Sequence, residues 1–171
     1  MAAPSSSDLV AALEASRLNF EAASQGLSDA EASKKPASDS WSVLECIEHI
    51  CIVETITVGR MQTAETVKPE RDSAKEAMIA ARAENRSSKI QGPALAMPKG
   101  RFTTLPDAMA EFGATRSRTI AFVESCPNLD CLRLTHPLFG PLTGREYILL
   151  NAAHSNRHAA QIREIREQMG Q

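Results

Sequence analysis

Two histidines near the C-terminal end of the chain have a spacing that suits metal binding. His154 and His158 lie four residues apart in the stretch NAAHSNRHAAQI, residues 151–162. This alanine-rich stretch reads as helix, and residues i and i+4 of a helix share one face. Two imidazoles placed in this way can bind one metal ion. The glutamate that follows the first histidine in the H-E-x-x-H motif of zinc peptidases is replaced here by Ser155, so we do not expect a peptidase of that kind.

A metal ion held by two histidines lacks ligands, and His49 is the candidate for a third. It lies in the middle of an apolar helical stretch, where a polar ring without a partner would cost a few kcal/mol. Three histidines from two helices would leave open coordination positions, which distinguish catalytic metal sites from structural ones. The alternative is that these histidines are ordinary hydrogen-bonded packing residues of the core. His136, which precedes a proline, is given no role as a ligand.

Other residues are expected close to the histidines. Tyr147, Asn151 and Gln161 fall on or beside the helical stripe of the C-terminal pair. Asn151 and Gln161 are either hydrogen-bonding partners of the metal ligands or polar contacts within the fold. Cys46, one turn before the third histidine, is either near the metal or inert packing. Trp41 is expected to anchor the core at a helix start rather than to contact a substrate.

The helices that must position these residues are predicted from apolar periodicity and from helix caps. Ser42 with Glu45, and Thr143 with Glu146, form capping boxes that mark two helix starts. The pattern predicts long helices near 7–24, 41–64, 104–125 and 143–169, and a shorter one near 73–85. No strand pattern extends beyond a few residues, so we expect an all-α four-helix bundle without a β-sheet.

A long crossover, residues 66–103, separates the second and third long helices and contains several prolines and glycines. A connection of this length allows the two helices that it joins to run parallel, so simple up-down-up-down order is not required. We expect this crossover and a loop at 132–142 to line the mouth of the site.

The bulk composition narrows the class of protein. The length of 171 residues suits one domain, residues 1–171, with a full core. A formal net charge of -2 and an aromatic content of 4% argue against a nucleic-acid partner and against an anionic membrane surface. The start, MAAPSSSDLV, does not resemble a signal peptide, and no apolar run approaches the roughly 18 residues of a membrane span. We therefore expect a cytoplasmic protein whose four cysteines are reduced.

Over nearly its whole length the sequence resembles the DinB superfamily, the DinB/YfiT-like metalloproteins. The resemblance rests on Trp41 and Ser42 followed by His49, on HPLFGPLTGREY, on the final H-x-x-x-H-x-x-Q-I pattern, and on MPKGRFTTLPDAMAEF before the third long helix. It implies a four-helix bundle that binds a divalent metal, zinc or nickel, often as a homodimer. The implied ligands are His49, His154 and His158.

The resemblance also implies activities. Characterised members include S-transferases that use a low-molecular-weight thiol such as bacillithiol or mycothiol, and a mycothiol-dependent maleylpyruvate isomerase. The expectation is therefore a metal-dependent enzyme that transfers such a thiol to an electrophilic small-molecule substrate. A metal-dependent hydrolase and a non-catalytic metal-binding stress or sensor protein are the alternatives, and a helical interaction module with vestigial histidines is a further one.

The chemistry of a three-histidine site favours the first of these hypotheses. Neutral ligands leave the ion its full +2 charge, so a thiol or water bound to it would lose a proton near neutral pH. Asn151 and Gln161 cannot accept a proton, so the histidine stripe offers no obvious general base. Thiol transfer needs no base once the thiolate has formed, so it is the favoured reaction. Hydrolysis is the runner-up.

Overall fold

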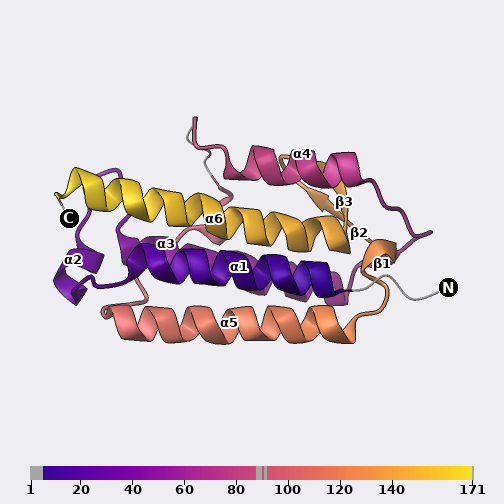
Figure 1. Cartoon of the computed structure of the whole chain (residues 1–171), viewed down its shortest axis with the longest axis horizontal. Coiled ribbons are helices and arrows are strands. Elements are labelled where there is room, and N and C mark those ends of the chain that lie inside the picture. The colour runs from indigo at the N-terminus through magenta and orange to yellow at the C-terminus, as the bar shows by residue number, and fades with distance from the viewer. Residues whose placement is uncertain (1–5, 88–89, 91, 171) are drawn as a thin grey trace.

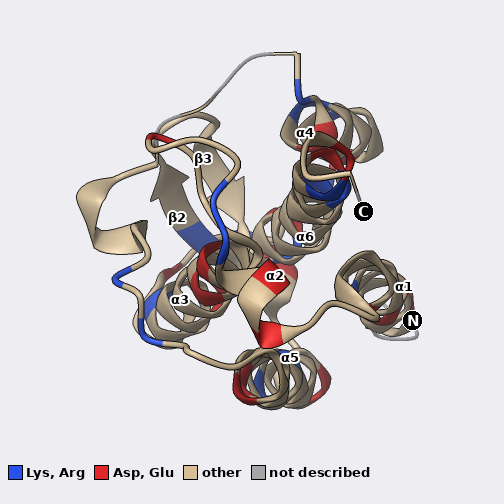
Figure 2. Ribbon diagram, turned by 90° about the vertical axis from the view of Figure 1, so that its left-hand side faces the viewer, with Lys and Arg blue, Asp and Glu red and all other residues tan. Residues whose placement is uncertain are grey.

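The computed structural model describes residues 6–87, 90 and 92–170, and its long helices form a four-helix bundle (Figure 1). The four are α1 (Ser7–Ser24), α3 (Val43–Gln62), α5 (Leu105–Ser125) and α6 (Gly144–Gln168). Seen end on in Figure 2, they surround a common axis, and α4 (Ser73–Glu84) packs outside the bundle against α6. The predicted fold class is therefore confirmed.

The helix starts follow local hydrogen-bonding patterns in the sequence. Ser42 and Thr143 each accept a hydrogen bond from the backbone N–H of a glutamate three residues on, and that glutamate accepts one from the N–H of the cap residue. The two boxes fix the starts of α3 and α6 close to the predicted positions. A third box, Ser28 with Glu31, begins the short helix α2 (Asp29–Ser33), for which no helix was predicted.

The expectation of a chain without a β-sheet was wrong. Strands β2 (Leu132–His136) and β3 (Gly140–Thr143) form an antiparallel hairpin where a loop was expected. The short strand β1 (Glu65–Thr66) pairs antiparallel with β2. Gly140 begins β3 with a φ of +71°, a conformation that glycine adopts without steric cost. These strands are too short for an alternating pattern to stand out in the sequence, and β1 pairs with a segment far along the chain.

The long crossover lets two consecutive long helices, α3 and α5, run parallel. Glu48 near the start of α3 contacts residues 99–101 just before α5. Further along both helices, Glu54 of α3 contacts Arg116 of α5. Contacts thus advance in the same direction along α3 and α5, an arrangement that the length of the crossover allows. Strand β1 lies at the start of the crossover. Helix α4 and the 3-10 turn η1 (Ala94–Ala96) lie within its described residues.

Helices α3 and α6 are antiparallel and meet along a polar seam. His49 lies against His154, whereas Arg60, further along α3, lies against Tyr147, nearer the start of α6. We call this region the α3–α6 seam, made up of His49, Thr57 and Arg60 of α3 and Tyr147, Asn151, His154 and His158 of α6. The three predicted ligands, with Tyr147 and Asn151, therefore share one interface, whereas Cys46 and Gln161 lie outside it.

The apolar core is divided into two clusters. One, at the hairpin end, includes Leu13 and Ile148, and the other, at the α2 end, includes Phe20 and Ile162. Along α1, α3, α5 and α6, buried polar residues lie between the two clusters: Ser16, Glu54, Arg116 and Ser155. The centre of the bundle is therefore polar, although both ends are apolar.

Arg116 organises this buried polar network. Its guanidinium is fully buried and donates to the Glu54 carboxylate, to Ser16 Oγ at 2.8 Å and to Ser155 Oγ at 2.7 Å. Thr119 donates to the same carboxylate at 2.9 Å. One charge pair thus connects all four long helices, and its neighbours satisfy the remaining donors and acceptors.

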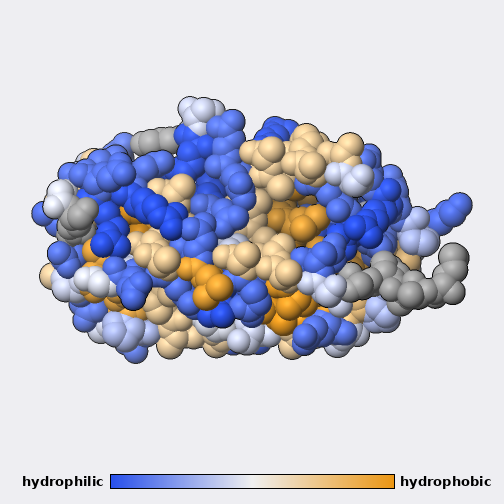
Figure 3. Space-filling model, in the orientation of Figure 1, coloured by the Kyte–Doolittle hydropathy of each residue, from blue (hydrophilic) through white to orange (hydrophobic). Residues whose placement is uncertain are grey.

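The surface is mainly hydrophilic on the face shown in Figure 3, with apolar areas scattered over it. The large apolar side chains that are most exposed, Leu18, Met78, Leu95 and Leu138, come from different elements or connections. No helix in the described part of the chain is long and apolar enough to cross a membrane.

Candidate metal centre

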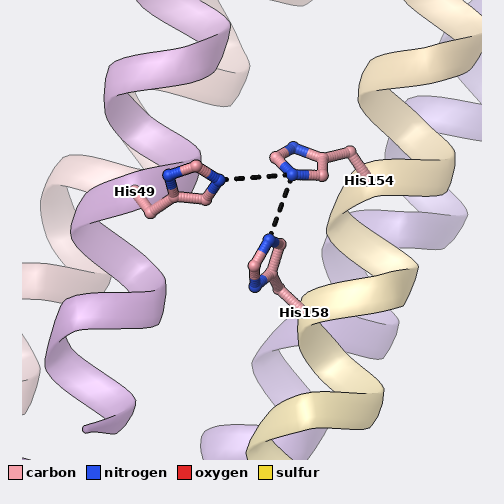
Figure 4. A group of neighbouring side chains, drawn as sticks. All are labelled: His49, His154 and His158. Atoms are coloured by element: carbon pink, nitrogen blue, oxygen red, sulfur yellow. Dashed lines mark hydrogen bonds between the residues drawn. The ribbon is translucent and has the colours of Figure 1, made fainter. Parts of the chain in front are cut away.

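His49 of α3 and His154 and His158 of α6 point toward one another across the seam (Figure 4). The Nε2 atoms of His49 and His154 are 3.3 Å apart, and those of His154 and His158 are 3.0 Å apart. In the part of the chain that the structure describes, these three alone form a group of potential ligands that all lie within 4.8 Å of one another. A tetrahedral zinc ion with Zn–N bonds of about 2.0–2.1 Å holds its ligand atoms about 3.3–3.4 Å apart. The two distances from His154 Nε2 are close to this value, and all three nitrogens lie within 4.8 Å of one another.

The protonation of the rings also fits a cation. Nδ1 of His49 lies 2.6 Å from the carbonyl oxygen of Ala96, which can only accept, so Nδ1 carries the proton and Nε2 presents a lone pair. Burial lowers the pKa of His49, lowers that of His154 to about 3, and lowers that of His158 well below its ordinary value. The rings are therefore neutral near pH 7. Neutral imidazole nitrogens gathered at this distance are the donor set that divalent zinc or nickel prefers.

The crossover that contacts His49 is fixed by a buried carboxylate. Glu48 is 4% exposed and accepts hydrogen bonds at 2.9–3.0 Å from three successive backbone N–H groups, those of Lys99, Gly100 and Arg101. Gly100 has a φ of +75°, which a side chain would strain. The turn η1 ends just before this clamp, so Glu48 helps to determine where the carbonyl of Ala96 meets His49.

We expect Glu48→Ala to weaken divalent-metal binding about 10–100-fold, the usual effect of removing a residue that orients a metal ligand. The reason is that three backbone N–H groups lose their acceptor and the carbonyl of Ala96 is no longer held against His49. Chelator competition with Co²⁺ or Zn²⁺ measures the affinity. Glu48→Gln, which keeps one acceptor oxygen, should recover part of it, and Glu124→Ala, at an exposed site on α5, should change nothing. Unchanged affinity in Glu48→Ala would show that the clamp does not orient the ligand.

Trp41 forms a wall of the site. Its ring centroid is 4.8 Å from that of His49 and 5.9 Å from that of His158, and it is stacked on the latter with an interplanar angle of 16°. On the crossover side, a Cβ at Gly92 would lie 3.8 Å from Cε1 of His49, an ordinary contact distance. Trp41, expected only as a core anchor, therefore lies against two of the candidate ligands. The crossover also lies against His49, at Gly92.

Cys46 lies outside the group of candidate ligands. Its side chain is fully buried in the apolar cluster at the α2 end, and burial raises the pKa of its thiol. An apolar environment of this kind makes a thiol unreactive. Of the two readings that the sequence left open for Cys46, the structure favours inert packing. All four cysteines are free, as expected.

Tyr147, Asn151 and Gln161 occupy the α6 stripe but bond elsewhere than to the histidines. The Tyr147 hydroxyl donates to the carbonyl of Thr135 at 3.2 Å. Gln161 accepts from Arg86 at 3.3 Å. Asn151 contacts α3 through its side-chain oxygen. Among the described residues, Tyr147 therefore bonds to the hairpin, Gln161 bonds to the crossover and Asn151 contacts α3.

Two arginines, Arg86 and Arg157, lie close enough to act on the α6 histidines. Arg86 and Arg157 lower the pKa of His158, and Arg157 and His136 lower that of His154. Arg157 is 7% exposed and donates to the carbonyl of Asn85. Neither arginine was singled out in the sequence, where a basic residue beside a histidine stripe looks like any solvated charge. Arg157 and Arg86, the latter paired with the Glu164 carboxylate at 2.5 Å, therefore lie beside the site.

His136 lies on the hairpin side of the site. Its ring is half-buried, with centroids 5.2 Å from that of Phe139 and 5.6 Å from that of Tyr147. Nδ1 accepts from the backbone N–H of Leu138 at 3.1 Å, which leaves the proton on Nε2. Burial, and then the charge of Arg60, lower the pKa of His136. His136 is thus a neutral imidazole close enough to affect His154 without being one of the converging ligands.

The sequence matches a known protein family and a known relative. The sequence model of the DinB superfamily matches residues 12–162. The uncharacterized protein YuaE of Bacillus subtilis (strain 168) is 30% identical over 146 residues, which cover 85% of this chain and 89% of YuaE.

Two solved structures share the fold. YfiT from Bacillus subtilis, described as a probable metal-dependent hydrolase with an unusual four-helix bundle topology, aligns with a TM-score of 0.61 and 18% identity. The alignment covers 99% of this chain and 90% of YfiT. TT2238, described as a four-helix bundle protein, aligns with a TM-score of 0.57 and 19% identity over 94% of this chain and 99% of TT2238.

Proposed function

Because the chain belongs to the DinB superfamily, we propose that it is a divalent-metal-dependent enzyme that joins a low-molecular-weight thiol to an electrophilic small molecule. The observation that carries the proposal is the convergence of three neutral imidazoles with Nε2 contacts of 3.0 and 3.3 Å. In this proposal His49, His154 and His158 hold zinc or nickel. An ion with three neutral ligands, when bound, supplies a +2 charge that lowers the pKa of a thiol or water at its open position. We further propose that the working form is a cytoplasmic homodimer.

The residues around the histidines support thiol transfer. Arg86, which is itself paired with Glu164, and Arg157 place positive charge near the α6 histidines, which favours a thiolate over a neutral thiol. The sulfur of the thiolate forms a bond to the electrophilic carbon, and the leaving group departs with its electron pair. No proton has to be removed during this step, so it needs no general base.

Hydrolysis is the second candidate, and two observations favour it. The structural relative YfiT is described as a probable metal-dependent hydrolase. His136 also offers a neutral imidazole near His154, which could remove a proton from an attacking water molecule. The two candidates therefore differ in whether His136 is needed.

Parallel assays on the metal-loaded protein separate the candidates. One assay supplies low-molecular-weight thiols with monobromobimane or chlorodinitrobenzene, and the other supplies a panel of p-nitrophenyl esters. We expect accelerated thiol conjugation that is lost in His154→Ala but stays within about twofold of the wild-type rate in His136→Gln. Accelerated ester cleavage that falls by about 100-fold or more in His136→Gln would identify a hydrolase instead. Metal binding without either activity would indicate a non-catalytic metal-binding protein.

A further inference from the structure

Asn151 carries a buried polar group that no protein atom satisfies. Its side chain is 3% exposed, and its Nδ2 has no hydrogen-bond partner among the described residues. The other end of the amide, Oδ1, lies 3.5 Å from the hydroxyl of Thr57. The single proton of that hydroxyl goes to the carbonyl of Val53 at 2.9 Å, so Thr57 is fixed on α3 and its approach to Asn151 is a contact only. Buried N–H groups without partners are rare and destabilising, so one that persists calls for an explanation.

The position of Asn151 supplies that explanation. Residues 151, 154 and 158 are spaced by three and four, so they share one face of α6. Since α3 and α6 are antiparallel, the contact between Thr57 and Asn151 lies beyond the contact between His49 and His154, toward the hairpin. The two residues between Asn151 and His154 are alanines. Asn151 is therefore the first polar side chain of this stripe on the hairpin side of the histidines.

We infer that Asn151 is a binding residue for the small molecule at the metal centre and donates a hydrogen bond from Nδ2 to an anionic or oxygen acceptor of that molecule. The inference rests on the proposed function. The Asn151 side chain is 3% exposed, so its packed surroundings restrict the amide before the ligand arrives.

This role makes an unusual prediction about stability. In Asn151→Leu the side chain keeps nearly the same volume but lacks the unpaired N–H, so the metal-free protein should be at least as stable to urea as the wild type. A residue that serves only packing or helix contacts would instead lose stability on this change. Thr57 would keep its bond to the carbonyl of Val53 in the variant.

Anion binding to the cobalt-substituted, full-length protein tests the inference, with azide as the probe and the visible absorption of Co²⁺ as the readout. We expect Asn151→Leu to weaken azide binding about tenfold or more, the usual effect of losing a hydrogen bond to a charged group, while Co²⁺ affinity stays within about threefold. Asn151→Ala should behave in the same way. Asn156→Ala is the matched control, because Asn156 lies on the same helix but bonds to Asn19 and Glu84.

Each other outcome overturns the inference in a distinguishable way. Wild-type azide affinity in Asn151→Leu would remove Asn151 from the site and leave the metal centre standing. Loss of Co²⁺ together with azide would make Asn151 a structural residue. If the wild-type protein binds Co²⁺ but not azide, Asn151 does not bind an anion at this centre and the inference fails. If the wild type binds no Co²⁺, the proposed function fails as well.

Discussion

Replacing His158 with alanine is expected to abolish stoichiometric binding of the divalent ion. His158 supplies one of three converging nitrogens, and its Nε2 is 3.0 Å from that of His154. Without His158 only two histidines remain to hold the ion, and water fills the positions that they leave open. We therefore expect the affinity for the ion to fall by more than the 10–100-fold that is typical of residues that only orient a ligand. Elemental analysis after dialysis against a weak chelator measures the loss directly.

A thermal-shift measurement adds an independent readout. A ligand that binds only the folded state at 100 times its Kd stabilises that state by about 2.7 kcal/mol, so zinc or nickel should raise the Tm of the wild type and not that of His158→Ala. His136→Ala is the control, because His136 lies near the site but outside the group of converging nitrogens. Equal metal loss in both variants, or full metal content in His158→Ala, would contradict the three-histidine site.

The parts of the fold that the sequence predicted are those encoded locally. Capping boxes such as Ser42 with Glu45 operate within a single turn, so they identified the starts of α3 and α6 without knowledge of the tertiary structure. The hairpin could not be recognised in this way. Each of its strands is at most five residues long, and β1 contributes only the pairs of Glu65 with Arg133 and Thr66 with Leu132. Pairing between segments so distant in sequence depends on the packing of the bundle rather than on local propensity.

In the candidate site, too, the sequence predicted the residues whose relation is local and missed those that depend on the tertiary structure. The spacing of His154 and His158 is a local property of one helix, and adding His49 required only that two apolar helices face each other. The partner of His49 is different, because the carbonyl of Ala96 is a backbone atom that any residue could supply. Glu48 likewise looks like an ordinary surface charge in the sequence, and only the path of the crossover shows that it is buried against three N–H groups.

The polar centre of the bundle bears on how rigidly the site is held. Ser155 accepts from Arg116 at 2.7 Å and directly follows His154 on α6. Glu54 of the same network lies on α3 between His49 and Thr57. The network therefore ties together the two helices that carry the candidate ligands, and buried networks in which every member is satisfied restrict a core to one arrangement.

The largest effect on stability is expected for Glu54→Gln. This change leaves the charge of Arg116 uncompensated in a position with 0% exposure, and breaking a buried ion pair by removing one partner costs about 3–5 kcal/mol. Urea denaturation of the metal-free protein measures the change in the free energy of unfolding. Arg17→Ala is the control, since the pair of Arg17 with Glu21 is partly exposed and should contribute about 1 kcal/mol or less.

A double variant shows whether the charge pair or its burial is responsible. Glu54→Leu combined with Arg116→Met removes both charges together with the energy needed to take them out of water, so it should recover most of the stability that Glu54→Gln loses. If the double variant is as unstable as the single one, the hydrogen bonds of Arg116 to Ser16 and Ser155 contribute more than its pairing with Glu54. A loss below about 1 kcal/mol in Glu54→Gln would mean that the pair is not buried in solution.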